Sequence, residues 1–166
     1  MTIARKRAGK RSNWATPAAL FARYHTRYRF TCDRAAEAWN AKLPTFFSEE
    51  QNALEQVWTG CGFTNPPYDD LWPWCAQALA ATLGKERTSE LELLLLPVRT
   101  DRDWFHEIVL PFARIEYLRG RVNMVPPPEW KGRNNQPAEA SMIVVFERRI
   151  HAGDFGRNGD ADRRAR

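Results

Sequence analysis

The chain alternates short apolar runs with segments whose apolar residues recur at helical spacing. Three apolar runs predict strands in the first two thirds of the chain, at residues 29–32, 61–64 and 91–98. The third run is apolar on both faces except at Glu92, a pattern typical of a central strand covered by helices on both sides. Two later strands are predicted at residues 114–124 and 142–150.

Helical patterns fill the intervals between these runs, and the first has a clear start signal. Residues 17–28 are predicted to be a helix with Thr16 as its N-cap and Pro17 at the first helical position. Residues 34–42 form a second helical stretch that ends before Pro44.

Three further helices are predicted from capping and stop signals. Residues 48–58 begin with a capping box, in which Ser48 is followed three positions later by Gln51. The next helix starts at Asp69 or Asp70 and ends at Gly84, and the last covers residues 103–113, interrupted by Pro111.

Strands that alternate with helices predict an α/β fold with a mostly parallel sheet and helices on both faces. The last two strands lack a long intervening helix, so a late antiparallel pair is expected there. A chain of 166 residues fits one domain, which we place at residues 13–150. Residues 1–12 are expected to be a basic flexible arm, residues 151–166 a disordered tail, and residues 126–137 an exposed connection.

Composition argues against a membrane protein, a secreted protein and a cysteine-based metal site. No apolar run approaches the length of a membrane span or a secretory signal, so the sequence predicts no membrane partner and a cytoplasmic location. The three cysteines lack metal-ligand spacing and are expected to be reduced thiols, with no metal site. Five tryptophans are expected to be packing anchors: Trp39, Trp58, Trp72, Trp74 and Trp104.

The positive charge is concentrated at the amino terminus. The first 29 residues hold eight basic residues and no acid, whereas the whole chain has a net charge of +5. Such an arm can track phosphates, and this predicts a nucleic-acid partner. The alternative is a solvated tail that only aids solubility.

Residues 65–68 read Asn-Pro-Pro-Tyr and follow a predicted strand. The Asn65 side-chain oxygen and the Pro66 carbonyl are two acceptors that can grip the two hydrogens of a planar amino group, and Pro67 fixes the direction of the Pro66 carbonyl. Tyr68 offers an aromatic face for a base removed from its stack. Asn65, Pro66, Pro67 and Tyr68 therefore predict a catalytic site for methyl transfer to an amino nitrogen; the alternative is simple turn punctuation.

The order of motifs resembles the phage-type Dam family of DNA N6-adenine methyltransferases. The landmarks are Trp14-Ala15-Thr16-Pro17, Asp33-Arg34-Ala35-Ala36, Asn40-Ala41-Lys42, Trp58, Asn65-Pro66-Pro67-Tyr68, Leu96 to Asp101, Gly120-Arg121, and Ser141 leading into Val144-Val145-Phe146. The resemblance implies a trimmed Rossmann-like methyltransferase sheet that uses S-adenosylmethionine as its cofactor.

The resemblance also implies where the cofactor binds. It points to Thr16 and Pro17 at the methionine end, to Asp33 at the end of the first strand, and to the neighbouring residues Trp14, Ala36 and Asn40. From the residues alone, Asp33 is either a cofactor ligand or the N-cap of the next helix. The sequence departs from ordinary methyltransferases in lacking a Gly-rich loop after the first strand, and no acid for the cofactor ribose is identified.

Recognition of a substrate is expected to rely on loops, because no separate recognition block interrupts the core. Arg99 and Thr100 follow the central strand and are predicted to contact phosphates or base edges; the alternative is a strand-to-helix turn. The predicted reaction is methyl transfer to adenine N6 in DNA. The alternatives are methylation of RNA adenine or of protein glutamine, and an inactive nucleic-acid-binding relative. Oligomeric state stays open.

Overall fold

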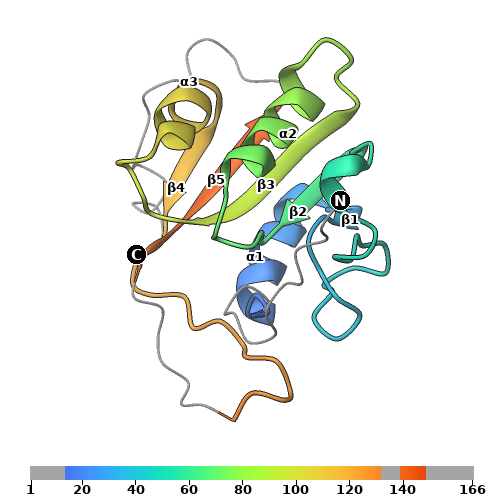
Figure 1. Ribbon diagram of the computed structural model, residues 1–166, viewed down its shortest axis with the longest axis vertical. Helices are drawn as coiled ribbons and strands as arrows, with labels where there is room; N and C mark the ends of the chain where they lie inside the picture. The colour runs from blue at the N-terminus through green and yellow to red at the C-terminus, as the bar shows by residue number, and fades with distance from the viewer. Residues whose placement is uncertain (1–13, 132–138, 149–166) are drawn as a thin grey trace, which may run out of the picture.

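The computed structural model describes residues 14–131 and 139–148. Its centre is a five-stranded sheet in the order β1-β2-β3-β5-β4 (Figure 1). The strands are β1 (Cys32–Asp33), β2 (Gly60–Thr64), β3 (Ser89–Pro97), β4 (Arg114–Tyr117) and β5 (Ser141–Glu147). The predicted basic arm and carboxyl-terminal tail, and much of the predicted connection at residues 126–137, lie outside the described residues.

The directions of the strands confirm the predicted sheet. β1, β2 and β3 pair in parallel, while β5 runs antiparallel to both β3 and β4, so β5 alone runs against the other four strands. The longest strand, β3, lies in the middle of the sheet, as the apolar run in the sequence predicts. The antiparallel pair of β4 and β5 is the late pair that the sequence indicates.

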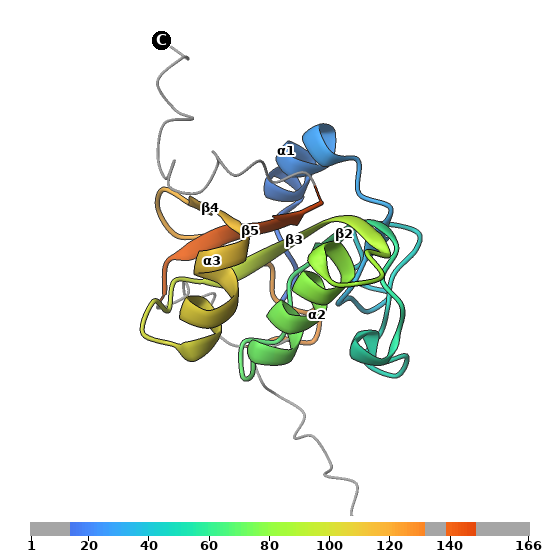
Figure 2. The same ribbon diagram turned by 90° about the horizontal axis from the view of Figure 1, so that it is seen from above.

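Helices cover both faces of the sheet, which confirms the predicted fold class (Figure 2). The helix α1 (Ala18–Tyr28) packs Phe21 and Tyr24 against alternate residues of β3 and β5. On the other face, α2 (Trp72–Leu83) packs with the π-helical turn η3 (Phe105–Val109) and the short helix α3 (Leu110–Phe112). The side chains of β3 thus alternate between two apolar layers.

The beginning of α1 differs by one residue from its prediction. Pro17, rather than Thr16, occupies the N-cap position, and no side chain there accepts a hydrogen bond from the first turn. Thr16 is buried, with 2% of its surface exposed. The N–H groups at the start of a helix have no partner within the helix. Proline has no N–H group, so Pro17 adds no unpaired donor at this position. The helix ends at Arg29, whose φ of 53° closes it in a left-handed cap.

The predicted helix at residues 34–42 is wrong. This segment is an irregular loop because its backbone hydrogen bonds go to distant partners: the N–H of Arg34 donates to Phe63 O at 2.8 Å, and the N–H of Ala36 donates to Phe47 O at 3.1 Å. Just before the segment, Asp33 pairs with Thr45 and Phe47, with N–O distances of 3.0 and 2.9 Å. The loop therefore folds back so that Phe46 lies beside Asp33 as a short parallel bridge. Backbone pairing at the sheet edge thus prevails over local helix propensity.

The predicted helix at residues 48–58 is also wrong, although its capping box does form. The Ser48 N–H donates to Gln51 Oε1 at 2.9 Å, and the Gln51 N–H approaches Ser48 Oγ at 3.4 Å. Asn52 then takes a φ of 49°, which stops the helix after one turn, and only the 3-10 turn η2 (Ala53–Glu55) follows. The two helices predicted after residue 68 are present. Gly84 caps α2, as predicted, whereas the predicted interruption at Pro111 is wrong, because helical structure continues from the π turn η3 through Pro111 to Phe112.

Several side-chain predictions can be compared with this fold. Trp58 and Trp104 are core residues, whereas Trp39 and Trp72 are 39% and 41% exposed, so their predicted packing role is wrong. All three cysteines are free. Within residues 14–131 and 139–148, no helix is long and apolar enough to cross a membrane, and no group of three or more His, Cys, Asp or Glu side chains is placed to hold a metal ion.

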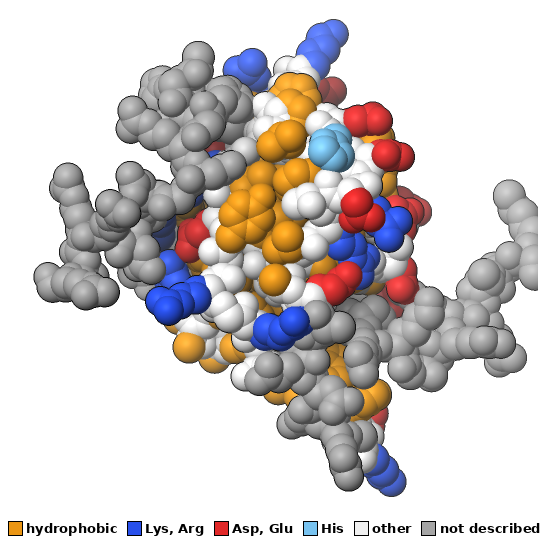
Figure 3. Space-filling view, turned by 90° about the vertical axis from the view of Figure 1, so that its left-hand side faces the viewer, with side chains coloured by type: hydrophobic (Ala, Val, Ile, Leu, Met, Phe, Trp, Pro, Cys, Tyr) orange, Lys and Arg blue, Asp and Glu red, His pale blue; other side chains and the backbone are white. Residues whose placement is uncertain are grey.

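An apolar patch marks the outer edge of the sheet. Figure 3 shows hydrophobic side chains gathered on the side of the molecule where α3 and β4 lie. The large exposed apolar side chains of these elements are Leu110, Phe112 and Tyr117. None of them belongs to the cavity described below.

Candidate active site

The carboxyl ends of three parallel strands bring the predicted site residues to one edge of the sheet. Asp33 ends β1, Asn65 follows β2, and Arg99 follows β3 after one intervening residue. Because these strands are parallel and adjacent, the three positions lie side by side (Figure 1). Open α/β sheets bind their ligands at this edge.

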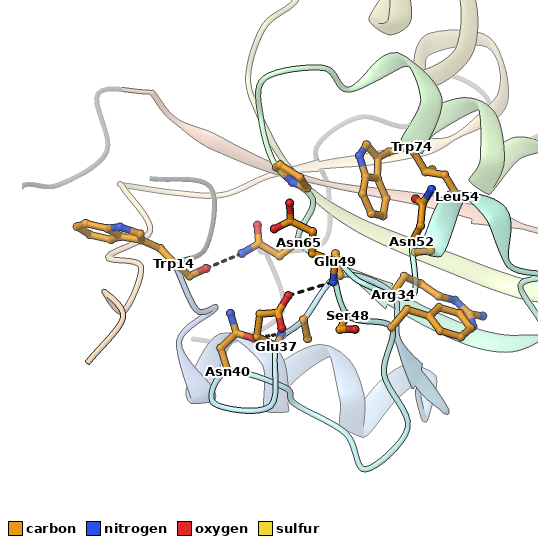
Figure 4. A pocket seen from close by; sticks show the side chains of 15 residues that line it. Trp14, Arg34, Glu37, Asn40, Ser48, Glu49, Asn52, Leu54, Asn65 and Trp74 are labelled. Atoms are coloured by element: carbon orange, nitrogen blue, oxygen red, sulfur yellow. Dashed lines mark hydrogen bonds between the residues drawn. The ribbon is translucent and has the colours of Figure 1, made fainter. Parts of the chain in front are cut away.

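The side chain of Asn65 is held in a defined orientation. Its Nδ2 donates to the backbone carbonyl of Trp14 at 3.2 Å (Figure 4). A carbonyl oxygen can only accept, so the amide nitrogen faces Trp14 and the amide oxygen faces the other way. Asn65 Oδ1 accepts from the Tyr68 hydroxyl at 3.2 Å and has a second lone pair for another donor.

The hydroxyl of Tyr68 anchors the end of the Asn-Pro-Pro-Tyr loop. It lies 3.2 Å from both Asn65 Oδ1 and the backbone carbonyl of Leu95 in β3. Burial raises the pKa of the Tyr68 hydroxyl, so the group keeps its proton and acts as a donor at neutral pH. The ring packs against the apolar layer that contains α2. Pro66 is buried, and Pro67 is half-buried.

The position of the Trp14 carbonyl depends on a segment far away in the sequence. Ala15 and Val125 form an antiparallel bridge, with N–O distances of 2.7 and 2.8 Å. The rings of Trp14 and Trp130 meet edge to face, with centroids 5.4 Å apart. The connection between β4 and β5 therefore supports the residue that orients Asn65.

A cavity of about 260 Å³ opens beside Asn65. Figure 4 shows its labelled side chains converging from the residues before α1, the loop after β1, the Asn-Pro-Pro-Tyr loop and the start of α2. Its lining residues are Trp14, Arg34, Ala35, Ala36, Glu37, Asn40, Phe47, Ser48, Glu49, Asn52, Ala53, Leu54, Asn65, Pro67 and Trp74. The irregular segment that replaces the two predicted helices thus forms most of the cavity wall.

The polar groups of this wall are organised by short hydrogen bonds. Glu37 Oε1 accepts the N–H of Glu49 at 3.0 Å, and Asn40 Oδ1 accepts the N–H of Glu37 at 2.7 Å. Asn52 Nδ2 donates to Glu55 Oε1 at 2.7 Å. Two carboxylates, Glu37 and Glu49, therefore line the cavity together with the amides of Asn40, Asn52 and Asn65.

A buried ion pair lies beneath the cavity. Arg34 Nη2 and Glu92 Oε1 are 2.8 Å apart, and their side chains are 2% and 0% exposed. Further hydrogen bonds support the pair, since Arg34 donates to Thr59 O at 2.7 Å and Ser89 Oγ approaches Glu92 Oε1 at 2.7 Å. Burial raises the pKa of Glu92, while Arg34 and Ser89 favour the charged carboxylate. The pair fixes the backbone at the start of the loop that forms the wall.

The buried carboxylate of Asp33 accepts hydrogen bonds from the same loop. Its Oδ2 accepts the N–H of Lys42 at 3.0 Å and its Oδ1 accepts the N–H of Ala35 at 3.4 Å. Burial raises the pKa of Asp33 to about 6, although these backbone hydrogen bonds oppose the rise. The alternative role of Asp33 as a helix N-cap is wrong, because a loop and not a helix follows it. The residue Asp33 is buried, with 2% of its surface exposed, and it does not line the cavity.

The structure brings part of the predicted set together. Five predicted site residues line the cavity: Trp14, Ala36, Asn40, Asn65 and Pro67. Others adjoin it in sequence but do not line it: Thr16, Pro17, Asp33, Pro66 and Tyr68. Arg99 and Thr100 lie beyond the wall, and Arg99 is engaged by Glu139 and Tyr68.

The other ten residues of the wall were not predicted as site residues, and they include Arg34, Glu37, Glu49 and Trp74. One signal was present, namely a lone Glu92 within an apolar strand, because a buried acid requires a buried cation. Nothing in the sequence pattern marked Glu37 or Glu49, whose positions depend on a loop that was taken for two helices.

The α/β sheet with a polar loop at its edge agrees with the methyltransferase class that the resemblance of the motifs implies. The family model described as DNA N-6-adenine-methyltransferase (Dam) matches residues 4–156, so the chain belongs to this family. A relative from Haemophilus phage HP1 (strain HP1c1), named DNA N-6-adenine-methyltransferase, is 29% identical over 162 residues, covering 93% of this chain and 90% of the relative.

Proposed function

We propose that this enzyme transfers a methyl group from S-adenosylmethionine to the N6 amino group of adenine in DNA. The observation that carries the proposal is the orientation of Asn65: its nitrogen faces Trp14 O, which leaves its oxygen as an acceptor beside a cavity large enough for part of a nucleoside. The family to which the chain belongs and the name of its phage relative support adenine in DNA as the substrate.

Asn65 and Pro66 would hold the amine. The amino nitrogen of adenine is a poor nucleophile because its lone pair is delocalised into the ring. Asn65 Oδ1 and the Pro66 carbonyl would accept its two hydrogens and so direct the lone pair at the methyl donor. Both acceptors belong to a loop that is tied to Trp14 at one end and to Leu95 at the other, so little reorganisation is needed when the base arrives.

Tyr68 would support a base flipped out of the duplex. Its hydroxyl is fixed by the contacts at Leu95 and Asn65, which sets the plane of the ring. Stacking of a base on such a ring is worth roughly 1–3 kcal/mol, comparable to the cost of unstacking it. Tyr68 orients the substrate and takes no part in proton transfer.

The residues around the cavity suit S-adenosylmethionine. When bound, this cofactor supplies an electrophilic methyl group on a sulfonium centre. Glu37 and Glu49 are placed to accept hydroxyl or ammonium hydrogens, and Trp74 offers an aromatic wall. With a volume of about 260 Å³, the cavity is slightly smaller than the usual range for small-molecule sites, about 300–1,000 Å³. Asp33 would act indirectly, by holding the loop that carries Glu37 and Asn40.

DNA would approach from the amino-terminal side of the site. The basic residues Arg5, Lys6, Arg7, Lys10 and Arg11 lie outside the described residues, but the chain continues from them directly into Trp14. We therefore propose that these residues contact the phosphates of the bound DNA. Replacing all five with glutamine should lower the salt dependence of DNA binding by about one in log–log slope for each phosphate that is no longer neutralised.

The decisive experiment is incubation with labelled S-adenosylmethionine and adenine-containing DNA, followed by analysis of the nucleosides. Label on adenine N6 is expected. Parallel reactions with RNA and with a glutamine-containing protein test the other planar amines, and preferred labelling of either would refute the DNA assignment. Absence of transfer to all three, combined with salt-sensitive DNA binding, would indicate a binding protein that has lost catalysis.

Calorimetry with S-adenosylmethionine tests the cavity separately from catalysis. Glu37→Gln keeps an oxygen for the N–H of Glu49 but removes the charge, so the affinity should fall roughly 10- to 100-fold. The matched control is Glu50→Gln, because Glu50 is an exposed neighbour of Glu49 outside the cavity. Equal affinities for the two variants would show that the cofactor binds elsewhere.

A further inference from the structure

Arg99 connects the Asn-Pro-Pro-Tyr loop to the segment that leads into β5. Its Nη1 donates to the backbone carbonyl of Tyr68 at 2.8 Å. Its Nε and Nη2 donate to the two carboxylate oxygens of Glu139, each at 2.8 Å. One guanidinium group thus joins three parts of the chain: the end of β3, the loop after β2 and the approach to β5.

The geometry of these contacts uses the particular shape of arginine. A planar guanidinium can form a two-pronged contact with a carboxylate and still direct another N–H elsewhere, whereas a lysine ammonium cannot keep all three bonds in fixed directions. The Arg99 side chain is 27% exposed, so the contacts are partly shielded from water. The hydrogen bond to Glu139 raises the pKa of Arg99, and the same hydrogen bond lowers the pKa of Glu139.

This arrangement leaves little reason for Arg99 to bind a phosphate. Its charge is already compensated by Glu139, and all three guanidinium nitrogens donate to protein oxygens. A phosphate would have to displace a carboxylate that is held by two charge-assisted bonds. Arg102 contrasts with it, because its side chain is 60% exposed and it pairs with the adjacent Asp101 at the longer distance of 3.5 Å.

The bond to Tyr68 O bears directly on the proposed chemistry. The single proton of the Tyr68 hydroxyl is shared between Leu95 O and Asn65 Oδ1, so the two ends of Tyr68 are anchored by separate contacts, the side chain at β3 and the backbone at Arg99. Pro66, which offers the second acceptor for the amine, lies only two residues before that backbone anchor. Movement of the Tyr68 carbonyl would therefore shift the acceptor geometry.

We propose that Arg99 is a positioning residue, which holds the Asn65–Tyr68 loop through the Tyr68 carbonyl and is itself held by Glu139. It acts through this loop and does not contact DNA, in contrast to the binding role that the sequence predicts for it. The proposal rests on the proposed function for the chemistry of the loop, but not for the contacts themselves.

The test compares Arg99→Lys and Glu139→Gln with the control Arg102→Gln. Both site variants should lower kcat roughly 10- to 100-fold, because small misplacement of reacting groups has effects of this size. The apparent KM for DNA and the salt dependence of DNA binding should not change. The double variant should lose little more than Arg99→Lys alone, since both changes disrupt one unit. Arg102→Gln should keep the wild-type kcat.

A phosphate-binding role would give the opposite pattern and would overturn the proposal. Arg99→Lys or Arg99→Gln would then leave kcat unchanged at saturating DNA, and Arg99→Gln would reduce the salt slope by about one. Glu139→Gln would tighten DNA binding, because it removes a competing negative charge.

NMR spectroscopy in the absence of DNA makes the test independent of the proposed reaction. The Tyr68 carbonyl and the Asp69 N–H belong to one peptide group, so loss of the Arg99 bond in Arg99→Lys should shift the amide resonance of Asp69, while those of α2 from Cys75 onward keep their positions. An unchanged Asp69 amide resonance would refute the positioning role even if wild-type protein methylates another acceptor. Conversely, wild-type protein that methylates no DNA but shows this shift in the variant would refute only the proposed substrate.

Discussion

Asn65 Nδ2 lies 3.2 Å from the backbone carbonyl oxygen of Trp14, and this contact decides which way the Asn65 side-chain oxygen points. An amide that rotated by half a turn would place two acceptor oxygens against each other. The orientation of the acceptor is therefore set before a substrate binds. Because Trp14 is supported by Trp130 and Ala15 by Val125, this orientation depends on residues more than a hundred positions apart in sequence.

Substitution of Asn65 should separate the orientation from the acceptor itself. Asn65→Asp keeps an oxygen toward the substrate but turns a second oxygen toward Trp14 O, so we expect a loss of roughly tenfold in kcat, equivalent to about one hydrogen bond. Asn65→Ala removes the acceptor and should lower kcat by about 10²- to 10³-fold, as for other preorganised polar groups. Single-turnover methylation of an adenine-containing duplex measures both losses.

A matched control for the Asn65 variants is Asn123→Asp, which makes the same chemical change at an exposed position between β4 and β5. Its single-turnover rate should equal that of the wild type. Full activity of Asn65→Ala would contradict the amine-gripping role, and full activity of Asn65→Asp would contradict the importance of the Trp14 contact alone.

Gly62 provides the space for the buried ion pair. A Cβ atom at this position would lie 1.8 Å from Glu92 Oε2 and 2.6 Å from Arg34 Nε. Neither side chain has room to withdraw, since both are almost fully buried. We therefore expect Gly62→Ala to lower the free energy of unfolding by about 3–5 kcal/mol, the range for breaking a buried pair, as measured by urea denaturation.

Gly120→Ala separates steric conflict from loss of glycine flexibility. Gly120 has a φ of 76°, but no atom lies within 4 Å of the added Cβ. Only the backbone penalty remains, which is about 1–2 kcal/mol for a residue with a side chain in the left-handed region. A loss at Gly62 no larger than the loss at Gly120 would mean that the ion pair moves aside without cost.

The sheet was predictable because its signals are local and strong. The run Leu93 to Leu96 has no alternative to burial, and its place between two helical layers follows from apolar residues on both faces. The position of Asn65 at the end of β2 could be predicted for the same reason. In contrast, Asn52 takes its positive φ within a segment whose capping box and apolar spacing both indicate a helix.

The cavity wall was not predictable because it depends on contacts between distant residues. Backbone pairing of Asp33 with Thr45 and Phe47 holds the loop open, and the carboxylate of Asp33 accepts the N–H of Lys42 nine positions later. Local propensity cannot register such pairing. Arg99 illustrates the same limit, since Glu139, its partner, lies 40 positions away.

Asp33 should make stability depend on pH. Its folded pKa of about 6 is above the unfolded value of 3.8, so the folded state binds more protons between these values. The contribution of the protonated carboxyl is fully present below about pH 4 and is lost as the pH rises through 6, by at most about 3 kcal/mol. Urea denaturation of wild type and Asp33→Asn from pH 4 to 7 measures the difference, in which the other carboxylates cancel.

The direction in which stability changes with pH distinguishes Asp33 from an ordinary salt-bridged carboxylate. Relative to Asp33→Asn, the wild type should become less stable between pH 4 and 6 and show a constant difference above pH 7. A wild type that gains stability over this interval would show that hydrogen bonds from Lys42 and Ala35 outweigh burial, and that the folded pKa of Asp33 is lowered.

The ion pair of Arg34 and Glu92 should behave as a unit when its members are replaced. Arg34→Met leaves Glu92 as an uncompensated buried charge, and Glu92→Leu leaves the guanidinium in the same state, so each should cost about 3–5 kcal/mol of unfolding free energy. The double variant buries no charge and should cost much less than the sum, giving a coupling of at least about 2 kcal/mol in a double-mutant cycle. Thr59 O limits the recovery, because it loses the Arg34 donor in the double variant, whereas Ser89 Oγ keeps Gly60 O as an acceptor at 2.7 Å. Additive losses in urea denaturation would show that the two charges are stabilised separately. Arg34 would then support the cavity wall mainly by its contact with Trp58, whose ring centroid lies 5.4 Å from the guanidinium carbon, and less by its ion pair with Glu92.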